Sequence, residues 1–287
     1  PNLSANQVRS LLISTARPFP AGSTCTTDLC GAGIVNAQGA VQAAQAAAVN
    51  YTDLWWFGQA YNGTGVSIIH HNDILFATWY VYDASGRGSW FVMPGGSWDA
   101  THTIFSGPMD ATLGAPFSDY SPPATLVQSG TMWLQFTNSG SGTLSYVTTT
   151  GQSGVLAMTR QPFGAPVTPT HLDYSDLWWG GPSEDGWGLT INQHYDTLVA
   201  IWYTYGQDGK PVFYFMPNGT WLSDSTLTGA IYATTGTPFG HAYNAAQFGV
   251  ESIGSGTFVF SDAGHATFTY TIAGIPTQTK SLVRQPL

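Results

Sequence analysis

The stretch "YTDLWWFGQAYNGTGVSIIHHNDILFATWYVY", residues 51–82, decides the fold because the chain contains it twice. Residues 174–205 read "YSDLWWGGPSEDGWGLTINQHYDTLVAIWYTY", an offset of 123 positions. Downstream, "FVMPGGSW" recurs as "YFMPNGTW", and toward the end the offset becomes 124, so that the triplet "RQP" beginning at Arg160 meets the one beginning at Arg284. Agreement in register over this length indicates two copies of one domain.

Each copy is predicted to be a β domain. Alternating aromatic and β-branched residues are interrupted by the turn signals "HHND", "DASGRG", "NSGSG" and "TTGQSG". Eight short antiparallel runs in one copy predict an up-and-down barrel, which leaves no open edge, and a β-sandwich is the alternative. The predicted domains span 51–163 and 174–287 and are joined by "GAPVTPTHLD". In the first copy the runs begin near Asp53, Val66, Leu75, Ser89, Thr103, Leu126, Thr143 and Val155.

One strand of each copy is apolar on both faces. This property is found in the run "ILFATWYVY" at 74–82 and in its counterpart "TLVAIWYTY". An antiparallel strand of a soluble barrel usually has one face exposed to solvent. We therefore expect the sister barrel, the preceding helical segment or another subunit to cover the outer face. In the first copy, Leu75, Ala77, Trp79 and Val81 are predicted on one face, and Ile74, Phe76, Tyr80 and Tyr82 on the other.

The first 48 residues have a different, helical character. "SANQVRSLLISTA" has the spacing of a helix with a capping box made by Ser4 and Gln7. A second helix, "AQGAVQAAQAA", follows Asn36 as its predicted N-cap. Between them lie Cys25 and Cys30, the two cysteines of the chain. Together with the scarcity of lysine, this pair predicts a secreted protein with one disulfide, and two free buried thiols in a cytosolic protein are the alternative.

Composition excludes several classes of partner. Charged residues make up 8% of the chain, the net charge is −9, and seven scattered Lys and Arg residues cannot form a basic face. Binding to nucleic acid or to an anionic membrane surface is therefore not expected. No apolar run approaches the roughly 18 residues that a membrane-spanning helix needs.

The helical segment resembles the end of the catalytic domain of secreted bacterial subtilisin-like serine peptidases, the subtilases. The residues that carry the resemblance are "PNLSANQVRSLLISTARPFP" from Pro1, the loop of Cys25 and Cys30, and "CGAGIVNAQGAVQAA" from Cys30 to Ala44. The resemblance covers residues 1–48 and implies that the two cysteines clamp the loop between the helices. It also implies an upstream protease domain in the same precursor, so that this chain starts inside that domain.

The chain departs from the subtilase pattern in one decisive respect. The Asp, His and Ser of the family's triad lie upstream of this tail, and neither a G-T-S-M nor a G-x-S-x-G stretch occurs here. Since acyl transfer needs all three groups within hydrogen-bond reach, the chain alone is expected to be inactive, although the resemblance implies that its parent is a serine endopeptidase. The two repeats resemble Trp-rich domains appended to secreted proteobacterial proteins, which imply no particular activity.

A severed peptidase tail would expose apolar helix residues unless something covers them. We expect the outer face of the barrels, around Ile74, Phe76, Tyr80, Val199 and Ile201, to cover them, with a neighbouring subunit as the second choice. The residues to be covered are Val8, Leu11, Leu12, Ile34, Val35 and Val41.

The candidate binding residues are mainly aromatic. Tryptophans around a barrel mouth can stack on a sugar, a peptide aromatic ring or a flat small molecule, and the alternative is that they only pack the core. The histidines show no zinc motif, and Glu184 and Asp185 align with Tyr61 and Asn62, so neither a metal, a cofactor nor a paired-acid glycosidase is expected. The predicted ligand-binding residues are Trp56, His71, Trp79, Tyr82, Trp98, Trp179, His194, Trp202, Tyr205 and Trp221.

These observations favour a C-terminal accessory region of a secreted, extracellular subtilase. Its tandem barrels would bind a protein or polysaccharide substrate, a matrix or the cell surface, and two linked sites would raise avidity. The alternative is structural: the barrels pack on the protease or mediate self-association and maturation without a ligand. Catalysis by the barrels themselves has the least support.

Overall fold

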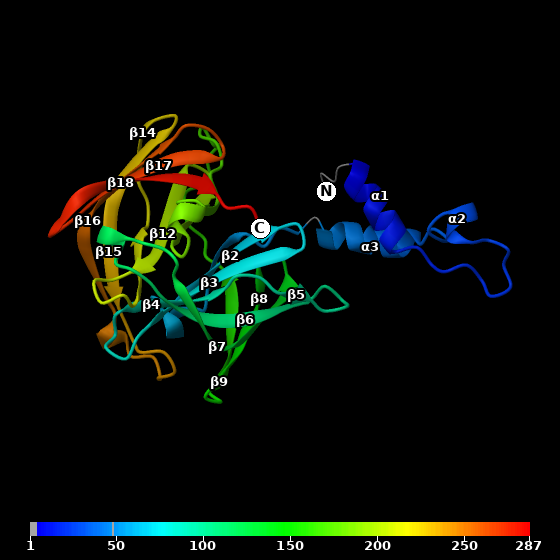
Figure 1. Cartoon of the computed structure of the whole chain (residues 1–287), viewed down its shortest axis with the longest axis horizontal. Helices are drawn as coiled ribbons and strands as arrows, with labels where there is room; N and C mark the ends of the chain where they lie inside the picture. The colour runs from blue at the N-terminus through cyan, green and yellow to red at the C-terminus, as the bar shows by residue number, and fades with distance from the viewer. Residues whose placement is uncertain (1–4, 48) are drawn as a thin grey trace. The chain divides into compact units, whose positions relative to one another are not determined.

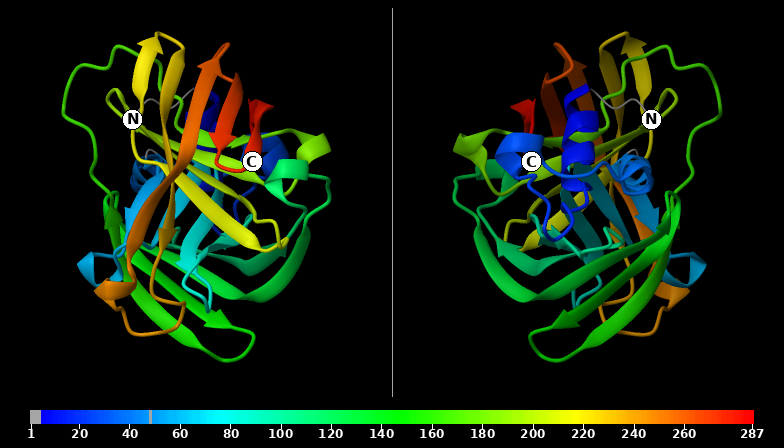
Figure 2. Two further views of the ribbon diagram at one scale, coloured as in Figure 1. Left: turned by 90° about the vertical axis from the view of Figure 1, so that its left-hand side faces the viewer. Right: turned by 90° about the vertical axis from the view of Figure 1, so that its right-hand side faces the viewer.

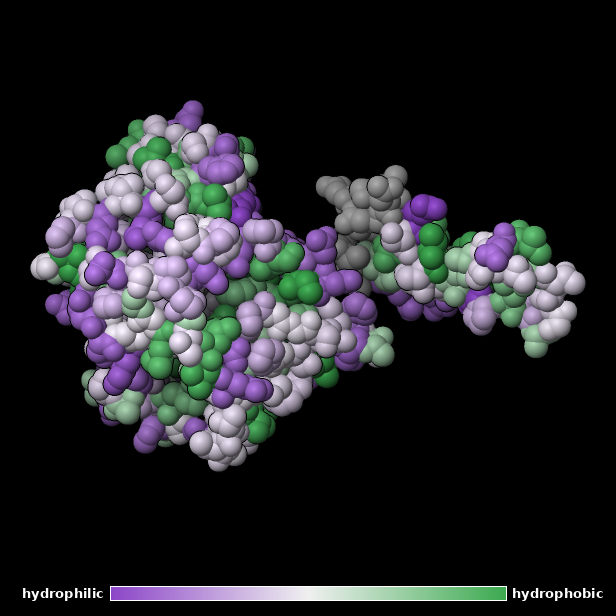
Figure 3. Space-filling view, viewed as in Figure 1, coloured by the Kyte–Doolittle hydropathy of each residue, from purple (hydrophilic) through white to green (hydrophobic). Residues whose placement is uncertain are grey.

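The computed structural model describes residues 5–47 and 49–287. The chain divides into a helical unit that ends at Tyr51 and a β unit from Thr52 to Leu287. The β unit consists of two antiparallel barrels that lie side by side, the first coloured cyan to green and the second yellow to red (Figures 1 and 2). On the face shown in Figure 3, hydrophobic and hydrophilic residues of this unit are interspersed.

The first barrel is a closed ring of eight strands. Neighbouring strands pair in chain order, β1 closes the ring on β9, and β4 pairs with β6 through Val92 and Asp110. The short strand β5 (Ser97–Trp98) adds to β6 outside the ring. The ring strands are β1 (Asp53–Trp56), β2 (Gly65–His71), β3 (Ile74–Tyr82), β4 (Gly88–Met93), β6 (Ile104–Leu113), β7 (Thr125–Asn138), β8 (Ser141–Thr148) and β9 (Ser153–Arg160).

The second barrel repeats this topology. It closes through β10 on β18 and through β13 on β15, where Phe215 pairs with Tyr232, and the short strand β14 (Thr220–Ser223) lies outside the ring. Its ring strands are β10 (Asp176–Trp179), β11 (Gly188–His194), β12 (Thr197–Tyr205), β13 (Pro211–Met216), β15 (Thr226–Thr235), β16 (Gly249–Phe260), β17 (His265–Ile272) and β18 (Ile275–Arg284). Single 3-10 turns lie in the loops: η1 (Gln59–Tyr61), η2 (Phe117–Asp119), η3 (Pro182–Glu184) and η4 (Ala245–Gln247).

This architecture confirms the predicted pair of eight-stranded up-and-down barrels, and the β-sandwich alternative is wrong. All four predicted turn signals connect hairpin strands. The prediction missed β5 and β14, because two and four residues are too few to show a strand period.

The helical unit contains α1 (Ala5–Ser14), α2 (Thr27–Cys30) and α3 (Ala37–Ala47). The predicted cap of α3 is confirmed, since the Gly39 amide donates to Asn36 Oδ1 at 3.1 Å. Cys25 and Cys30 form a disulfide, so the free-thiol alternative is wrong. The capping box predicted at Ser4 lies outside the described residues. No helix in the described part of the chain is long and apolar enough to cross a membrane.

The doubly apolar strands β3 and β12 are covered by the opposite barrel. Phe76 and Trp90 of the first barrel pack on Tyr203 of the second, with ring centroids 6.4 and 5.1 Å apart, and Tyr80 packs on Phe213 at 5.1 Å. Phe76, Tyr80 and Tyr203 are at most 7% exposed. Of the three covers that the sequence left open for this face, the sister barrel is the correct one. The expectation that the face receives the helices is therefore wrong, because it is already occupied.

Each barrel also extends an arm into its sister. The loop after β6 places Phe117 against Trp202 of the second barrel, with ring centroids 5.1 Å apart. The loop after β15 places Phe239 against Trp79 of the first barrel at 5.3 Å. Matching backbone hydrogen bonds anchor the arms, from the Gly114 amide to the Gly209 carbonyl and from the Gly236 amide to the Gly86 carbonyl. Each barrel thus receives a phenylalanine from its sister against its own tryptophan, and we call these two residues, Phe117 and Phe239, the plugs.

The two plugs are expected to differ in strength. Phe117 is 4% exposed whereas Phe239 is half-buried, so Phe117→Ala should lower the free energy of unfolding by about 3–5 kcal/mol and Phe239→Ala by clearly less. Urea unfolding of the two variants beside the wild type measures both values. Equal losses, or a larger loss for Phe239→Ala, would contradict this account of the arms.

Candidate functional site

The mouth of the first barrel contains a cavity of about 310 Å³. Drug-sized ligands occupy pockets of about 300–1,000 Å³, so this volume lies at the small end of that range. Three segments surround it: the end of β3 with the β1–β2 loop, the β8–β9 turn, and the arm of the second barrel from Thr237 to Tyr243. The site therefore belongs to both copies, although it lies in the first barrel.

The floor of the cavity is aromatic. Phe239, the plug from the sister barrel, lies 5.3 Å from each of the rings of Trp79, Phe91 and Tyr146, and Trp79 lies 5.0 Å from Tyr146. Burial raises the pKa of Tyr146 above its ordinary value. Its phenol is therefore neutral at physiological pH, and the floor carries no charge.

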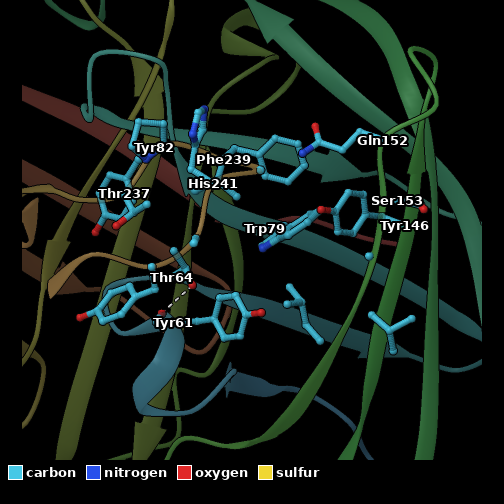
Figure 4. A pocket seen from close by; sticks show the side chains of 18 of the residues that line it. Tyr61, Thr64, Trp79, Tyr82, Tyr146, Gln152, Ser153, Thr237, Phe239 and His241 are labelled. Carbon is cyan, nitrogen blue, oxygen red and sulfur yellow. Dashed lines mark hydrogen bonds between the residues drawn. The ribbon is translucent and has the colours of Figure 1, made fainter.

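The rim of the cavity is polar and contains His241 but no carboxylate, lysine or arginine. In the view of Figure 4, Thr64 and Tyr61 lie across from Phe239 and His241. Tyr82 donates its hydroxyl hydrogen to the Gly63 carbonyl at 2.7 Å, which fixes the β1–β2 loop against β3. None of the described residues that line the cavity is Asp, Glu, Lys or Arg. A neutral ligand fits this lining better than an ion.

Gly63 is required at this position of the loop. Its φ of +86° lies in the region that glycine favours, and a Cβ there would lie 2.6 Å from both the Tyr82 hydroxyl and the ring of Phe248 in the sister barrel. The loop therefore reaches the mouth only because this residue has no side chain.

The β1–β2 loop and its counterpart in the second barrel exchange a large and a small residue, since Phe57 aligns with Gly180 and Thr64 aligns with Trp187. Trp187, which aligns with Thr64, is 3% exposed and lies 6.4 Å from Trp202. Its indole N–H donates to Glu184 Oε2 at 3.1 Å, and Lys280 forms an ion pair with Glu184 at 3.0 Å while lying 5.8 Å from the indole ring. In the first barrel the buried ring of Phe57 lies edge-on to Trp79 at 6.3 Å, so each barrel covers this tryptophan with a ring from a different position of the loop.

The structure gathers some of the predicted ligand-binding residues and separates others. Trp79 and Tyr82 line the cavity, and Trp202 and Tyr205 hold the same positions in the second barrel, where Tyr205 donates to the Gly186 carbonyl at 2.6 Å. Trp56 lies in β1 and Trp179 in β10, both partly exposed and outside the cavity lining.

One further predicted tryptophan lies at the other end of each barrel. Trp98 lies beside the β2–β3 turn of the first barrel, and Trp221 lies beside the β11–β12 turn of the second. Trp98 donates its indole N–H to the Asp73 carbonyl at 3.0 Å, and Trp221 donates to the Asp196 carbonyl at 2.8 Å. A histidine stacks on each ring: His102 on Trp98 and His171 on Trp221. These tryptophans hold turns and lie at the opposite end of their barrels from Trp79 and Trp202.

The predicted histidines bind carboxylates across the barrel interface. His71 Nε2 lies 2.8 Å from Asp176, and His194 Nε2 lies 3.0 Å from Asp53, so the two contacts are reciprocal. Each aspartate also pairs with an arginine of its own barrel: Asp53 with Arg160 at 2.9 Å, and Asp176 with Arg284 at 3.0 Å. These histidines join the barrels and lie outside the cavity lining.

Several lining residues were missed by the sequence analysis, above all Tyr61, Thr64, Gln152, Phe239 and His241. The alignment of the two copies gave no usable signal here, because the loops at 57–64 and 180–187 share only two glycines. The contribution of the arm had no signal, because its contact with the first barrel depends on how the barrels pair.

Metal binding and similarity to known proteins add little to this picture. Within residues 5–47 and 49–287, no three His, Cys, Asp or Glu side chains are grouped so that they could hold a metal ion.

Neither a protein-family model nor a curated protein matches the chain. Among solved structures it is similar to a "putative outer membrane protein" of Bacteroides fragilis, with 13% identity, 85% of this chain and 99% of that chain covered, and a TM-score of 0.18. A likeness this weak supports no conclusion about function.

The carboxylate of Asp53 should make the interface sensitive to acid. Burial alone would raise the pKa of Asp53, but hydrogen bonds from His194 and Arg160 outweigh it and hold the pKa below its ordinary value. A lowered pKa in the folded state gives stability that is present above the unfolded pKa of about 3.9 and is lost as the pH falls through the folded pKa. Asp53→Asn should therefore cost about 3 kcal/mol or more at pH 7, and the difference should shrink below pH 4.

Unfolding by denaturant at a series of pH values measures this difference. Asp262→Asn is the matched control, because its pair with His265 is exposed and should contribute little. An equal effect of the two substitutions at pH 7, or a difference for Asp53→Asn that does not change between pH 7 and pH 3, would refute the role given to Asp53.

Proposed function

We propose that the two barrels form a non-catalytic binding module and that the mouth of the first barrel is its binding site. The observation that carries this proposal is the cavity of about 310 Å³ at the mouth of the first barrel, which Trp79 and Tyr146 line together with Phe239 from the sister barrel. A cavity with an aromatic floor and a small number of polar groups at its rim has the general character of a ligand site.

In this proposal the module belongs to a secreted subtilisin-like serine endopeptidase and holds it on a protein or polysaccharide substrate, a matrix or the cell surface. The resemblance of residues 1–48 to the end of a subtilase catalytic domain supports the parentage, as do the helices and the disulfide of that segment. The coding sequence upstream of Pro1 tests it: a Gly-Thr-Ser-Met stretch within a few tens of residues is expected, and its absence would contradict the parentage.

A structural role is the second candidate, and one observation favours it. The barrels bury their apolar strands and plugs in each other, which makes a rigid tandem without any ligand. Such a tandem could stabilise the parent enzyme or assist its maturation. It does not account for the cavity at the mouth of the first barrel.

Replacement of Thr64 by tryptophan separates these candidates. Thr64→Trp should narrow the cavity that Thr64 lines and should weaken binding at least about tenfold. Its stability is measured beside its binding, because a large ring added next to the buried Phe57 can overpack this end of the barrel. Calorimetric titration or sedimentation with casein, elastin and chitin measures binding by the full chain.

Thr64→Ser is the control and should bind like the wild type. If a polymer binds equally well to Thr64→Trp, the mouth is not the binding site. If no polymer binds to the wild type, while deletion of the barrels prevents the parent enzyme from folding, the structural role is correct.

A further inference from the structure

We infer that the cavity at the mouth of the first barrel binds a neutral sugar ring, either as a free monosaccharide or as one residue of a glycan. This inference rests on the proposed function, because it names the ligand class of the same site. Its starting point is the hydroxyl group of Tyr146, a nearly buried residue that lines the cavity.

The Tyr146 hydroxyl has no hydrogen-bond partner in the protein. The residue is 8% exposed, and its ring lies 5.0 Å from that of Trp79 and 5.3 Å from that of Phe239. The hydroxyl points toward the middle of the lining residues (Figure 4), and no other group within residues 5–47 and 49–287 forms a hydrogen bond with it. A buried hydroxyl without a partner is unfavourable, so a ligand that supplies a donor or an acceptor there gains affinity.

The corresponding hydroxyl of the second barrel is paired by the protein itself. Tyr270 lies opposite Gln278 as Tyr146 lies opposite Gly154, so the two tyrosines are equivalent. The Tyr270 hydroxyl is 3.2 Å from the Phe117 carbonyl and 2.5 Å from Gln278 Oε1. Gly154 offers no such group, and a Cβ there would lie 2.7 Å from the Tyr146 ring. The fold therefore pairs this hydroxyl in one copy and leaves it facing the cavity in the other.

Further polar groups lie on several sides of the rim. The side-chain amide of Gln152 lies over Gly240 of the arm, where an added Cβ would clash with it, and it forms no hydrogen bond in the part of the chain that the structure describes. Tyr61 faces this side of the rim from the β1–β2 loop (Figure 4). Hydroxyl and amide groups can both donate and accept hydrogen bonds. A ligand that is polar around its whole edge can use all of them.

A sugar ring combines this polar edge with apolar faces. Its C–H faces can pack on an aromatic ring, and the half-buried ring of Phe239 is available for such a contact. Its hydroxyls radiate toward groups such as Tyr146 and Gln152. An aromatic hydrocarbon ring would cover the floor but leave the Tyr146 hydroxyl unpaired, and a protein side chain is polar at one end only. A cavity of about 310 Å³ is at the small end for ligand sites and suits one ring.

The lining also selects against charged sugars. No carboxylate, lysine or arginine is among the described residues that line the cavity. The carboxylate of a uronic acid or the ammonium of an amino sugar would lose water there without gaining an ion-pair partner inside the cavity. His241 is exposed at the rim and does not replace such a buried partner.

The mouth opens to solvent, since Tyr61 and Gln152 at its rim are exposed. A bound ring can therefore remain attached to a larger glycan. A free monosaccharide and a residue of a glycan are two sources of the same chemistry, and the experiment distinguishes them.

Saturation-transfer NMR and calorimetry with the full chain test the inference. The probes are glucose, galactose, mannose and N-acetylglucosamine, each as the free sugar and as a short oligosaccharide. Glucuronic acid and glucosamine are the charged controls, and indole and a tryptophan-containing peptide represent the other ligand classes. At least one neutral sugar should bind, and the charged sugars should bind at least about tenfold more weakly. Tighter binding of the oligosaccharide identifies a glycan site, and equal binding identifies a site for a single ring.

Two tyrosine substitutions form a matched pair. Tyr146→Phe removes the unpaired hydroxyl and keeps the ring, so it should weaken sugar binding about three- to tenfold without lowering the midpoint of urea unfolding. Tyr270→Phe removes the paired hydroxyl, so it should lower that midpoint and leave sugar binding unchanged. If Tyr146→Phe does not fold, the contrast between neutral and charged sugars still decides.

The possible failures are distinguishable. Sugar binding that Tyr146→Phe leaves unchanged, or a charged sugar that binds as well as a neutral one, would overturn the inference. Binding of indole or of the peptide that Thr64→Trp weakens, without binding of any sugar, would overturn the sugar ligand and leave the proposed site intact. If no sugar, aromatic probe or polymer binds in a way that depends on position 64 or 146, both the inference and the proposed site are wrong.

Discussion

Strands β3 and β12 are apolar on both faces, and the rest of the β unit depends on how this surface is removed from water. Because the two copies carry the same face, each can cover the other, and rings such as Tyr80 and Phe213 meet across the interface. This pairing brings Asp53 beside His194 and Asp176 beside His71. It also brings each arm to the mouth of the opposite barrel, so the plugs Phe117 and Phe239 follow from the same contact. Hydrophobic burial sets the arrangement, and the polar contacts fix its register.

The candidate site is a product of this pairing. An isolated first barrel would lack Phe239 and the rim from Thr237 to Tyr243, which belong to the arm of the second barrel. The aromatic floor is therefore only as rigid as the interface between the barrels. The parts that would contact a ligand are held by strand pairing on one side and by the arm on the other, which favours a largely preformed cavity.

Local sequence signals predicted most of the fold and little of the site. The period of two in strands such as β8 (Ser141–Thr148), the turn residues and the repeat depend on neighbouring residues, and these features predicted both barrels correctly. Asp53 and His194 each have a counterpart in the other copy, but their contact crosses between the copies and could not be deduced from either. The richness in tryptophan grouped Trp98 with Trp79, although they lie at opposite ends of one barrel, because composition carries no information about which end a strand residue occupies. The arm residue Phe239 was missed for the same long-range reason.

The difference between Thr64 and Trp187 has a consequence for how such a protein can evolve. If the barrels were separate, identical chains, they would associate as a symmetric homodimer, and any substitution would appear in both halves at once. Both halves would then carry the same pair of residues, either Phe57 with Thr64 or Gly180 with Trp187. Joined in one chain after duplication, the halves can change independently, so that one barrel can acquire a ligand at its cavity while the other keeps its own packing.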